Sequence, residues 1–352
     1  MSARRRPRIG PRTAFAATAA LGGVAAAAAL QRRHLHTLAH DPDYVALSAP
    51  LGGRPLAIAS VDGTELHAEA FGAEGDPTVV LGHGWTEQLS FWGPVIRRLT
   101  DRGLRPVAYD LRGHGRSAPA ADGDYSLDRF GEDVEAVLAA VTPEGERATV
   151  AGHSLGAMSI AAWARRHDVA ARIRAAALVN TGFGDLASGH LLFGALAKWA
   201  NHPWASRAVL GSRAPVPAFS TPAQESIIRH IAFGPDATRG QVAFYEHMLV
   251  ATPPDVRAAV GVVLSEMDLW DAVGRLTVPT LVIAGDHDRL TPPAHSRRIA
   301  AELPQPAGLI ELEDTGHMSP IERPREVSVA LTRLVREPAA VPAGSGESGG
   351  GI

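Results

Sequence analysis

A regular alternation of short apolar runs and amphipathic segments, from residue 54 to residue 336, most constrains the fold of this sequence. Eight runs have the length and β-branched content of strands, at residues 55–60, 65–71, 78–82, 106–110, 148–152, 175–180, 279–284 and 308–312. The later runs alternate with helical patterns, which favours a mostly parallel sheet covered by helices on both faces. The first two runs have no helix between them and are expected to pair as an antiparallel hairpin. The sequence therefore predicts an α/β fold with an eight-stranded, mostly parallel sheet.

One long segment, residues 183–276, interrupts this alternation. It contains no obvious strand, but it has four helical stretches, at residues 186–200, 222–232, 239–251 and 254–266. An insertion of this length between two strands is expected to form a helical cap over the mouth of the sheet. The globular part therefore divides into an α/β core, residues 54–182 and 277–336, and a helical cap, residues 183–276.

The two ends of the chain differ from this globular part. Five arginines precede residue 13, residues 13–30 are uncharged and mostly alanine, and Arg32 and Arg33 follow. This order is typical of a signal peptide or membrane anchor within residues 1–33, which predicts an exported or membrane-associated protein. The apolar stretch is shorter than the roughly 20 residues that span a bilayer comfortably, so an alanine-rich extension on a cytoplasmic enzyme is the alternative. Residues 337–352 are rich in Pro, Ala, Gly and Ser and are expected to be a disordered tail.

Composition excludes several classes of chemistry. The chain has no cysteine, which rules out disulfides, thiolate nucleophiles, iron–sulfur clusters and cysteine zinc sites. Lys198 is the single lysine, which argues against Schiff-base and P-loop mechanisms. A formal net charge of −3 gives no basic excess for nucleic acid. His34, His36 and His40 are interpreted as part of a solvated linker, and no metal or cofactor is predicted.

The strongest local signal is Gly152-His153-Ser154-Leu155-Gly156, which follows the predicted strand 148–152 and precedes a helical pattern. In a G-x-S-x-G turn the serine projects its hydroxyl above the edge of the sheet, and the glycines leave room for the sharply bent backbone. The turn also opens a helix, whose free N–H groups and dipole favour negative charge. We therefore predict Ser154 as the nucleophile and the Leu155 N–H as an oxyanion donor.

A second signal, Gly82-His83-Gly84-Trp85, directly follows the predicted strand 78–82. A glycine-flanked turn leaves the next backbone N–H pointing into a site, so Trp85 is the predicted second oxyanion donor. His83 is interpreted as a packing and hydrogen-bonding residue of the loop rather than a catalytic one. The side chains expected to line the substrate pocket are those of Trp85, Trp92, His153 and Met318.

The remaining roles need a carboxylate and a histidine, in that order, after two late strands. His317 follows the predicted strand 308–312 and would act as general base towards Ser154, then as general acid to the leaving group. Two aspartates, Asp286 and Asp288, follow the predicted strand 279–284. We favour Asp288, from its position in the loop, as the residue that fixes the tautomer of His317. Asp286 is interpreted as a capping or turn residue.

Together these motifs resemble the α/β-hydrolase superfamily, in the branch with HGW-type oxyanion loops and a helical cap. The resemblance covers most of residues 54–336 and rests on five ordered motifs, at residues 82–85, 110–117, 152–156, 285–292 and 316–317. It implies that loop 110–117 braces the site from outside. Some relatives carry the acid one strand earlier, but residues 179–182 here are Val-Asn-Thr-Gly and offer no carboxylate. Relatives that hydrolyse epoxides or remove halogens have aspartate at the elbow, so Ser154 does not support those reactions.

The resemblance and the triad predict a serine hydrolase that cleaves carboxylic esters with a largely apolar acyl group through an acyl-enzyme intermediate, as carboxylesterases and lipases (EC 3.1.1) do. A C–C bond hydrolase, lactonase, thioesterase or perhydrolase would need the same triad. A non-catalytic binding member of the fold is a further alternative. The expected partners are a small-molecule ester and, through residues 13–30, a membrane. The sequence does not indicate an oligomeric state.

Overall fold

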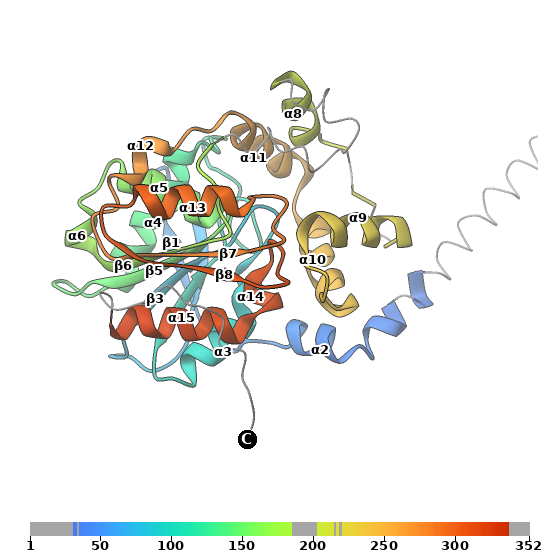
Figure 1. Cartoon of the computed structure of the whole chain (residues 1–352), viewed down its shortest axis with the longest axis horizontal. Helices are drawn as coiled ribbons and strands as arrows, with labels where there is room; N and C mark the ends of the chain where they lie inside the picture. The colour runs from blue at the N-terminus through green and yellow to red at the C-terminus, as the bar shows by residue number, and fades with distance from the viewer. Residues whose placement is uncertain (1–30, 34, 185–202, 215, 218–219, 338–352) are drawn as a thin grey trace, which may run out of the picture.

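The computed structural model describes residues 31–33, 35–184, 203–214, 216–217 and 220–337. An eight-stranded sheet forms its centre, in the order β1-β2-β4-β3-β5-β6-β7-β8 (Figure 1). The strands are β1 (Arg54–Ala59), β2 (Glu65–Ala70), β3 (Thr78–Gly82), β4 (Arg105–Tyr109), β5 (Ala148–His153), β6 (Ile173–Val179), β7 (Thr280–Gly285) and β8 (Pro306–Leu312). Strand β2 runs antiparallel to its neighbours β1 and β4, and all other pairs are parallel. The predicted mostly parallel sheet, with a hairpin at its edge, is confirmed.

Two layers of helices cover the sheet (Figure 1). On one face α3 (Gly93–Thr100) packs against α15 (Pro324–Arg336), and on the other lie α4 (Leu127–Val141), α5 (Leu155–Ala164) and α13 (Pro293–Glu302). Strands β5 and β7 are buried along their whole length because both faces are covered. Short elements complete the core: η1 (Leu89–Trp92), α6 (Val169–Arg172), α12 (Trp270–Val273) and α14 (Ser319–Glu322).

The chain between β6 and β7 forms a helical cap at one side of the core (Figure 1). Its described helices are α8 (Pro203–Leu210), α9 (Pro222–Ala232), α10 (Arg239–Ala251) and α11 (Pro254–Glu266). The carbonyl of Ala232, at the end of α9, accepts a hydrogen bond from His317 N at 2.8 Å. A Cβ on Gly261 of α11 would lie 3.2 Å from Trp85 Cζ2. The cap therefore touches both the oxyanion loop and the histidine loop. The helical stretch expected at 186–200 lies outside the described residues.

The residues before β1 pack on the cap, which was not predicted. Helix α2 (Pro42–Ser48) lies against α10, and Arg97 of α3 donates hydrogen bonds to the carbonyls of Ala46 (3.2 Å) and Ala49 (2.8 Å). Of the anchor segment expected at 1–33, only residues 31–33 are described, and they are helical. Residues 13–30 and the tail expected at 337–352 lie outside the described residues, apart from residue 337. In the part of the chain that is described, no single helix is long and apolar enough to cross a membrane.

Loop 110–117 is anchored by an ion-pair network around the fully buried Arg112. The Arg112 guanidinium donates two hydrogen bonds to Asp133 of α4, at 2.7 and 2.6 Å, and two to Asp62 of the β1–β2 turn, at 2.9 and 3.5 Å. Removing one partner of a buried pair typically costs about 3–5 kcal/mol, because the other charge is left uncompensated. On its inner side the loop donates from Leu111 N to His83 Nε2 at 2.9 Å. The loop thus braces the oxyanion loop from outside, as the resemblance implied.

Candidate active site

The nucleophile elbow turns the chain from β5 into α5 at Ser154. Ser154 has φ +48° and ψ −113°, a conformation that costs a non-glycine residue roughly 1–3 kcal/mol. A Cβ on Gly152 would lie 2.3 Å from a backbone nitrogen of α5, and a Cβ on Gly156 would lie 2.3 Å from Gly82 O. Neither glycine can therefore be replaced without moving backbone, and α5 packs directly on the end of β3. Ser154 is partly exposed although its neighbours are buried, so a substrate can reach it.

The first oxyanion donor comes from the start of α5. Leu155 is the first residue of the helix, so its N–H has no acceptor within the helix. The helix dipole also favours negative charge at this end. Among the hydrogen bonds of the described residues, none uses the backbone N–H of Leu155 or of Trp85. Both predicted donors are therefore available to a ligand.

The second donor is oriented by the peptide between Gly84 and Trp85. Gly84 O accepts hydrogen bonds from His83 Nδ1 at 2.8 Å and from Glu87 N at 3.3 Å. The described residues contain no cis peptide bond, and a planar trans peptide directs its N–H opposite to its carbonyl. The Trp85 N–H therefore points away from the side of the peptide on which His83 and Glu87 bond to Gly84 O.

His83 is neutral, and its hydrogen bonds define its tautomer. Nδ1 faces the Gly84 carbonyl, which can only accept, so Nδ1 carries the proton. Nε2 accepts from the Leu111 N–H and is therefore unprotonated. Burial, followed by the nearby His114 and His153, lowers the pKa of His83 well below its ordinary value. His83 thus supports the oxyanion loop, in the hydrogen-bonding role that the sequence suggested.

The predicted base, His317, pairs with the predicted acid, Asp288, and their Nδ1 and Oδ2 atoms are 2.8 Å apart. The Asp288 carboxylate also accepts from Thr291 Oγ1 at 2.8 Å and from the N–H groups of Leu290 and Thr291 at 2.9 Å. Burial alone would raise the pKa of Asp288, but His317 and these hydrogen bonds outweigh it and lower the pKa below its ordinary value. The ionised carboxylate keeps the proton on Nδ1 and leaves Nε2 unprotonated, which is the state that a general base requires.

Asp286, the competing aspartate, lies in a different environment. Its Oδ1 accepts from Thr315 N at 3.1 Å, and its own N–H donates to Leu312 O at 3.1 Å. These bonds tie the end of β7 to the end of β8. The geometry therefore favours Asp288 as the triad acid and gives Asp286 the turn-stabilising role.

Asn180, directly after β6, supports the triad acid and was not singled out from the sequence. Its Nδ2 donates to Asp288 Oδ2 at 3.0 Å and to Gly316 O at 3.1 Å. The Ser319 hydroxyl donates to its Oδ1, and the residue has a φ of +46°. At the position where some relatives carry the acid, this chain thus carries an amide that holds the acid of the next strand.

His153 lies behind the catalytic histidine in a buried ion pair. Its Nδ1 is 3.1 Å from Glu87 Oε2, and its Nε2 is 2.8 Å from His317 O. A carboxylate and a carbonyl can only accept, so both ring nitrogens donate and His153 is an imidazolium. Burial alone would lower the pKa of His153, but Glu87 outweighs it and raises the pKa. Because Glu87 Oε2 also accepts from Gly84 N at 2.5 Å, this pair joins the oxyanion loop to the histidine loop.

Three of the four side chains expected to line the substrate pocket are buried. His153 and Trp92 are fully buried, and Met318 is 1% exposed. The ring of His153 is held inward by its ion pair, Trp92 packs edge-on against Phe91 in the core, and Met318 is the N-cap residue of α14. Their contact with a substrate stays a prediction. Trp85 is partly exposed, and its indole lies next to α11 of the cap.

Glu322 is a further buried carboxylate next to the histidine loop. It accepts hydrogen bonds from the N–H groups of Gly234 (2.7 Å), Gly316 (3.1 and 3.2 Å) and Met318 (3.1 Å). Burial raises the pKa of Glu322 to about 7, although these donors act to lower it. The sequence offered only weak signals for these three supporting residues, namely their positions next to motifs. Glu322 follows the histidine motif, Asn180 follows strand β6, and Glu87 follows the glycine motif at 82–85.

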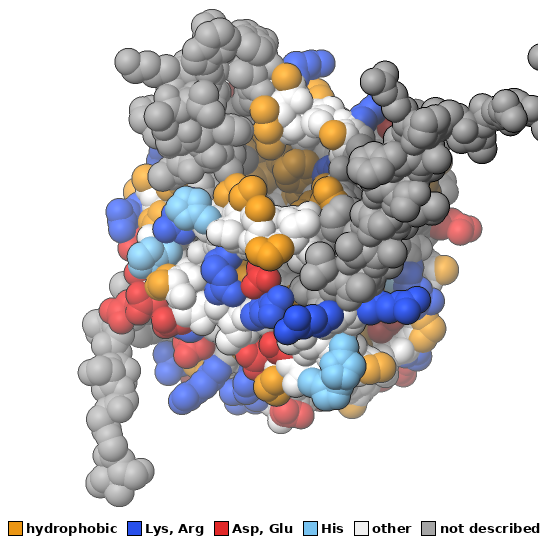
Figure 2. Space-filling view, turned by 90° about the vertical axis from the view of Figure 1, so that its right-hand side faces the viewer, with side chains coloured by type: hydrophobic (Ala, Val, Ile, Leu, Met, Phe, Trp, Pro, Cys, Tyr) orange, Lys and Arg blue, Asp and Glu red, His pale blue; other side chains and the backbone are white. Residues whose placement is uncertain are grey.

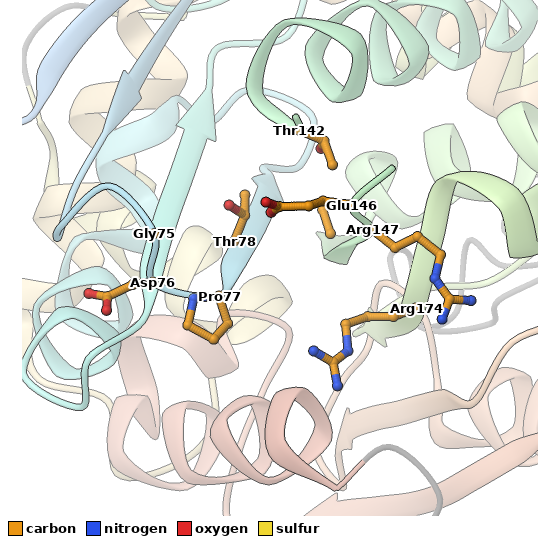
Figure 3. Close-up of a pocket in the computed structure, with 9 residues that line it drawn as sticks. Gly75, Asp76, Pro77, Thr78, Thr142, Glu146, Arg147 and Arg174 are labelled. Carbon is orange, nitrogen blue, oxygen red and sulfur yellow. The ribbon is translucent and has the colours of Figure 1, made fainter. Parts of the chain in front are cut away.

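The cap side of the molecule carries hydrophobic side chains. Figure 2 faces this side and shows them around a recess. A cavity of about 520 Å³, shown in Figure 3, lies at the opposite end of the strands, near Thr78, Ala148 and Arg174, and takes no part in the triad. Within the described residues, no group of three or more His, Asp or Glu residues could hold a metal ion.

Comparison with known proteins decides the family. The family model described as serine aminopeptidase, S33, matches residues 73–323, which include the oxyanion loop, the elbow, Asp288 and His317. The chain belongs to the α/β-hydrolase family. The resemblance inferred from the motifs is thereby confirmed.

Individual relatives of this α/β-hydrolase carry several activities. A protein assigned as carbamate hydrolase RutD of Variovorax paradoxus is 31% identical over 241 residues, which are 68% of this chain and 84% of that protein. The bifunctional esterase/perhydrolase DCH of Acinetobacter calcoaceticus is 25% identical over 79% of this chain and 99% of its own length. The crystal structure of the enol-lactonase from Burkholderia xenovorans LB400 superposes with a TM-score of 0.65 and 28% identity, covering 80% of this chain and all of that one.

We expect Asp288→Asn to lower kcat of the hydrolase about 1,000- to 10,000-fold, because an amide donates to Nδ1 and forces the proton onto Nε2. Asp286→Asn keeps an oxygen for the Thr315 N–H and should change kcat less than about threefold. Steady-state kinetics of both variants on one ester, with circular dichroism to verify folding, makes the comparison. An equal loss in both variants would contradict the assignment of Asp288.

Glu322 should make the hydrolase less stable as pH rises. Its folded pKa of about 7 lies above its ordinary value of 4.5, so the folded state binds more protons between these pH values. The contribution of Glu322 to the free energy of unfolding is therefore fully present below pH 4.5. It falls by about 3 kcal/mol as pH rises to 7. Urea unfolding of the wild type and of Glu322→Gln at pH 5 and pH 8 measures this difference. Identical pH dependences in the two proteins would show that Glu322 titrates normally.

Proposed function

We propose that this α/β-hydrolase cleaves carboxylic esters with a largely apolar acyl group by a serine acyl-enzyme route. The supporting observation is the position of the partly exposed Ser154, at the start of α5 and beside the Trp85 loop, on the sheet edge that also carries the Asp288–His317 pair. Acyl transfer requires a nucleophile, a base with its orienting acid, and donors for the negative charge. Each role has a residue here in the appropriate environment.

In the first half-reaction Ser154 Oγ bonds to the carbonyl carbon while its proton passes to His317 Nε2. The carbonyl oxygen becomes an oxyanion and accepts hydrogen bonds from the N–H groups of Trp85 and Leu155. Asp288 stabilises the imidazolium formed on His317. When the intermediate collapses, the bond to the alcohol oxygen breaks and that oxygen takes the proton from His317. The acyl group remains on Ser154.

In the second half-reaction a water molecule takes the place of the alcohol. His317 Nε2 removes a proton from the water as its oxygen bonds to the acyl carbon, and the same two N–H groups receive the charge. Collapse breaks the bond to Ser154 Oγ and returns the proton to it. The products are one carboxylic acid and one alcohol, and the enzyme is regenerated.

The relatives support a reaction at a carbonyl carbon. They are named for the hydrolysis of a carbamate, an ester and an enol-lactone, and each of these substrates contains an acyl group bonded to a heteroatom. An apolar acyl group fits the Trp85 indole, the adjoining α11 and the hydrophobic recess of Figure 2. A lactone is the second candidate, favoured by the likeness to the enol-lactonase over 80% of this chain. A lactone is an internal ester and requires no other catalytic group.

Nitrophenyl esters from acetate to palmitate test the reaction and the acyl preference together. We expect turnover by the wild type to rise beyond acetate, because longer chains bury more apolar surface. Ser154→Ala should lose at least about 1,000-fold of the rate, since the covalent route is removed. Equal rates in both proteins would exclude the serine mechanism, and an optimum at acetate would exclude an apolar acyl pocket. A parallel series of lactones distinguishes the second candidate.

We also propose that residues 13–30 attach the protein to a membrane or direct its export. Arginines before residue 13, the uncharged stretch itself and Arg32 and Arg33 support this. We expect the full chain to sediment with membranes, or to be exported, and a chain without residues 1–33 to stay in the soluble cell fraction. The same soluble fraction for both chains would contradict the proposal.

A further inference from the structure

The backbone of the histidine loop, residues 316–318, is hydrogen-bonded at every polar group. The Gly316 carbonyl accepts from Asn180 Nδ2, and the Met318 carbonyl accepts from Ile321 N and Glu322 N. The His317 carbonyl accepts from His153, and the His317 N–H donates to Ala232 O of the cap. The N–H groups of Gly316 and Met318 both donate to Glu322. The catalytic histidine is therefore held from both sides, and the cap supplies one of its backbone partners.

The Glu322 carboxylate connects this loop to the cap a second time. Its Oε2 accepts from Gly234 N at 2.7 Å, two residues after the end of α9. Its two oxygens also accept from the residues on either side of His317, Gly316 and Met318. One side chain thus joins the cap to both ends of the histidine loop.

The cap and the loop meet here backbone to backbone. A Cβ on Gly316 would lie 2.3 Å from Phe233 C, and a Cβ on Gly234 would lie 2.3 Å from Asp314 O. No side chain separates the two segments at this point. A movement of the cap away from the core would therefore break the Ala232–His317 and Gly234–Glu322 hydrogen bonds together.

Helix α14, which carries Glu322, belongs to the core and also contacts the cap. It packs against α15 and α3, and Figure 1 shows it between these helices and α10. From α10, Gln241 Nε2 donates to Ile321 O at 2.8 Å. Glu322 is thus placed by the core, at the joint between core and cap.

Only an acidic side chain of this length suits the position. A glutamate offers two oxygens with about four acceptor sites, which match three N–H donors. A glutamine offers one oxygen, and its amide would turn N–H groups towards N–H groups. Burying the carboxylate is unfavourable for folding, as its raised pKa indicates. The Glu322 carboxylate therefore supplies acceptors to the histidine loop at a cost in folding stability.

We propose that Glu322 is a positioning residue that locks the cap to the histidine loop. Docking of the cap on the core and alignment of His317 are thereby coupled. Glu322 does not touch the substrate and acts through the backbone of residues 316–318. The inference rests on the proposed function for its kinetic consequence. Its structural consequence can be measured without any substrate.

The kinetic test compares Glu322→Ala and Glu322→Gln with Glu326→Gln, an exposed glutamate one turn further along the chain. We expect Glu322→Ala to lower kcat about 10- to 100-fold, with KM changed less than about threefold, because the base is misaligned while the pocket remains. Glu322→Gln keeps one acceptor and should recover part of the loss. Glu326→Gln should behave as the wild type. Unchanged kcat in both Glu322 variants, or a loss in KM alone, would overturn the proposal.

The structural test is hydrogen–deuterium exchange at pH 8 on the full chain. In Glu322→Gln we expect faster exchange in two peptides together, 228–245 of the cap and 313–323 of the histidine loop, and no change in Glu326→Gln. Faster exchange in only one of them, or in neither, would overturn the coupling. If the wild type hydrolyses no ester and both peptides still respond together, the proposed function fails while the lock stands. If Glu322→Ala does not fold, Glu322→Gln carries both tests.

Discussion

The site depends on the direct contact of two backbones, that of Gly82 at the end of β3 and that of Gly156 in the first turn of α5. With no side chain between them, the helix lies against the strand, and the donors at Leu155 and Trp85 come from adjacent segments. A methyl group at Gly156 would have to separate helix from strand, and the two donors would no longer face one oxygen. The same packing maintains the strained backbone conformation of Ser154. Without this packing the chain would relax to a conformation of lower energy.

Of two buried histidines near the nucleophile, one is neutral and one is positively charged, and their hydrogen-bond partners explain the difference. His83 meets one acceptor and one donor, so it is neutral. His153 meets two acceptors, one of which is the carboxylate of Glu87, so it is charged. A buried charge is tolerated only with such a partner. The neutral ring orients the oxyanion loop, and the charged ring holds the backbone of His317.

The fold and the Asp288–His317 pair could be predicted because their signals are local: strand length, helical periodicity, and the glycine next to His317. The burial of Trp92 could not be predicted, because the direction of its side chain depends on tertiary packing rather than on its neighbours in the chain. The supporting residues were missed for a related reason. Asn180 meets Asp288 across 108 residues, and Glu322 meets Gly234 across 88. Such partners leave no periodic pattern in a single sequence.

The joint between cap and core has a consequence for how such enzymes can diversify. At the histidine loop, two of the cap's hydrogen bonds come from main-chain atoms, the Ala232 carbonyl and the Gly234 N–H, which nearly every amino acid possesses. These two bonds do not depend on the side chains of the cap, so they can persist while cap residues facing the substrate change, as long as a glycine stays at position 234. Main-chain hydrogen bonds of this kind can be kept by caps of different sequence. Substrate specificity can then change through substitutions in the cap while the residues of the core stay the same.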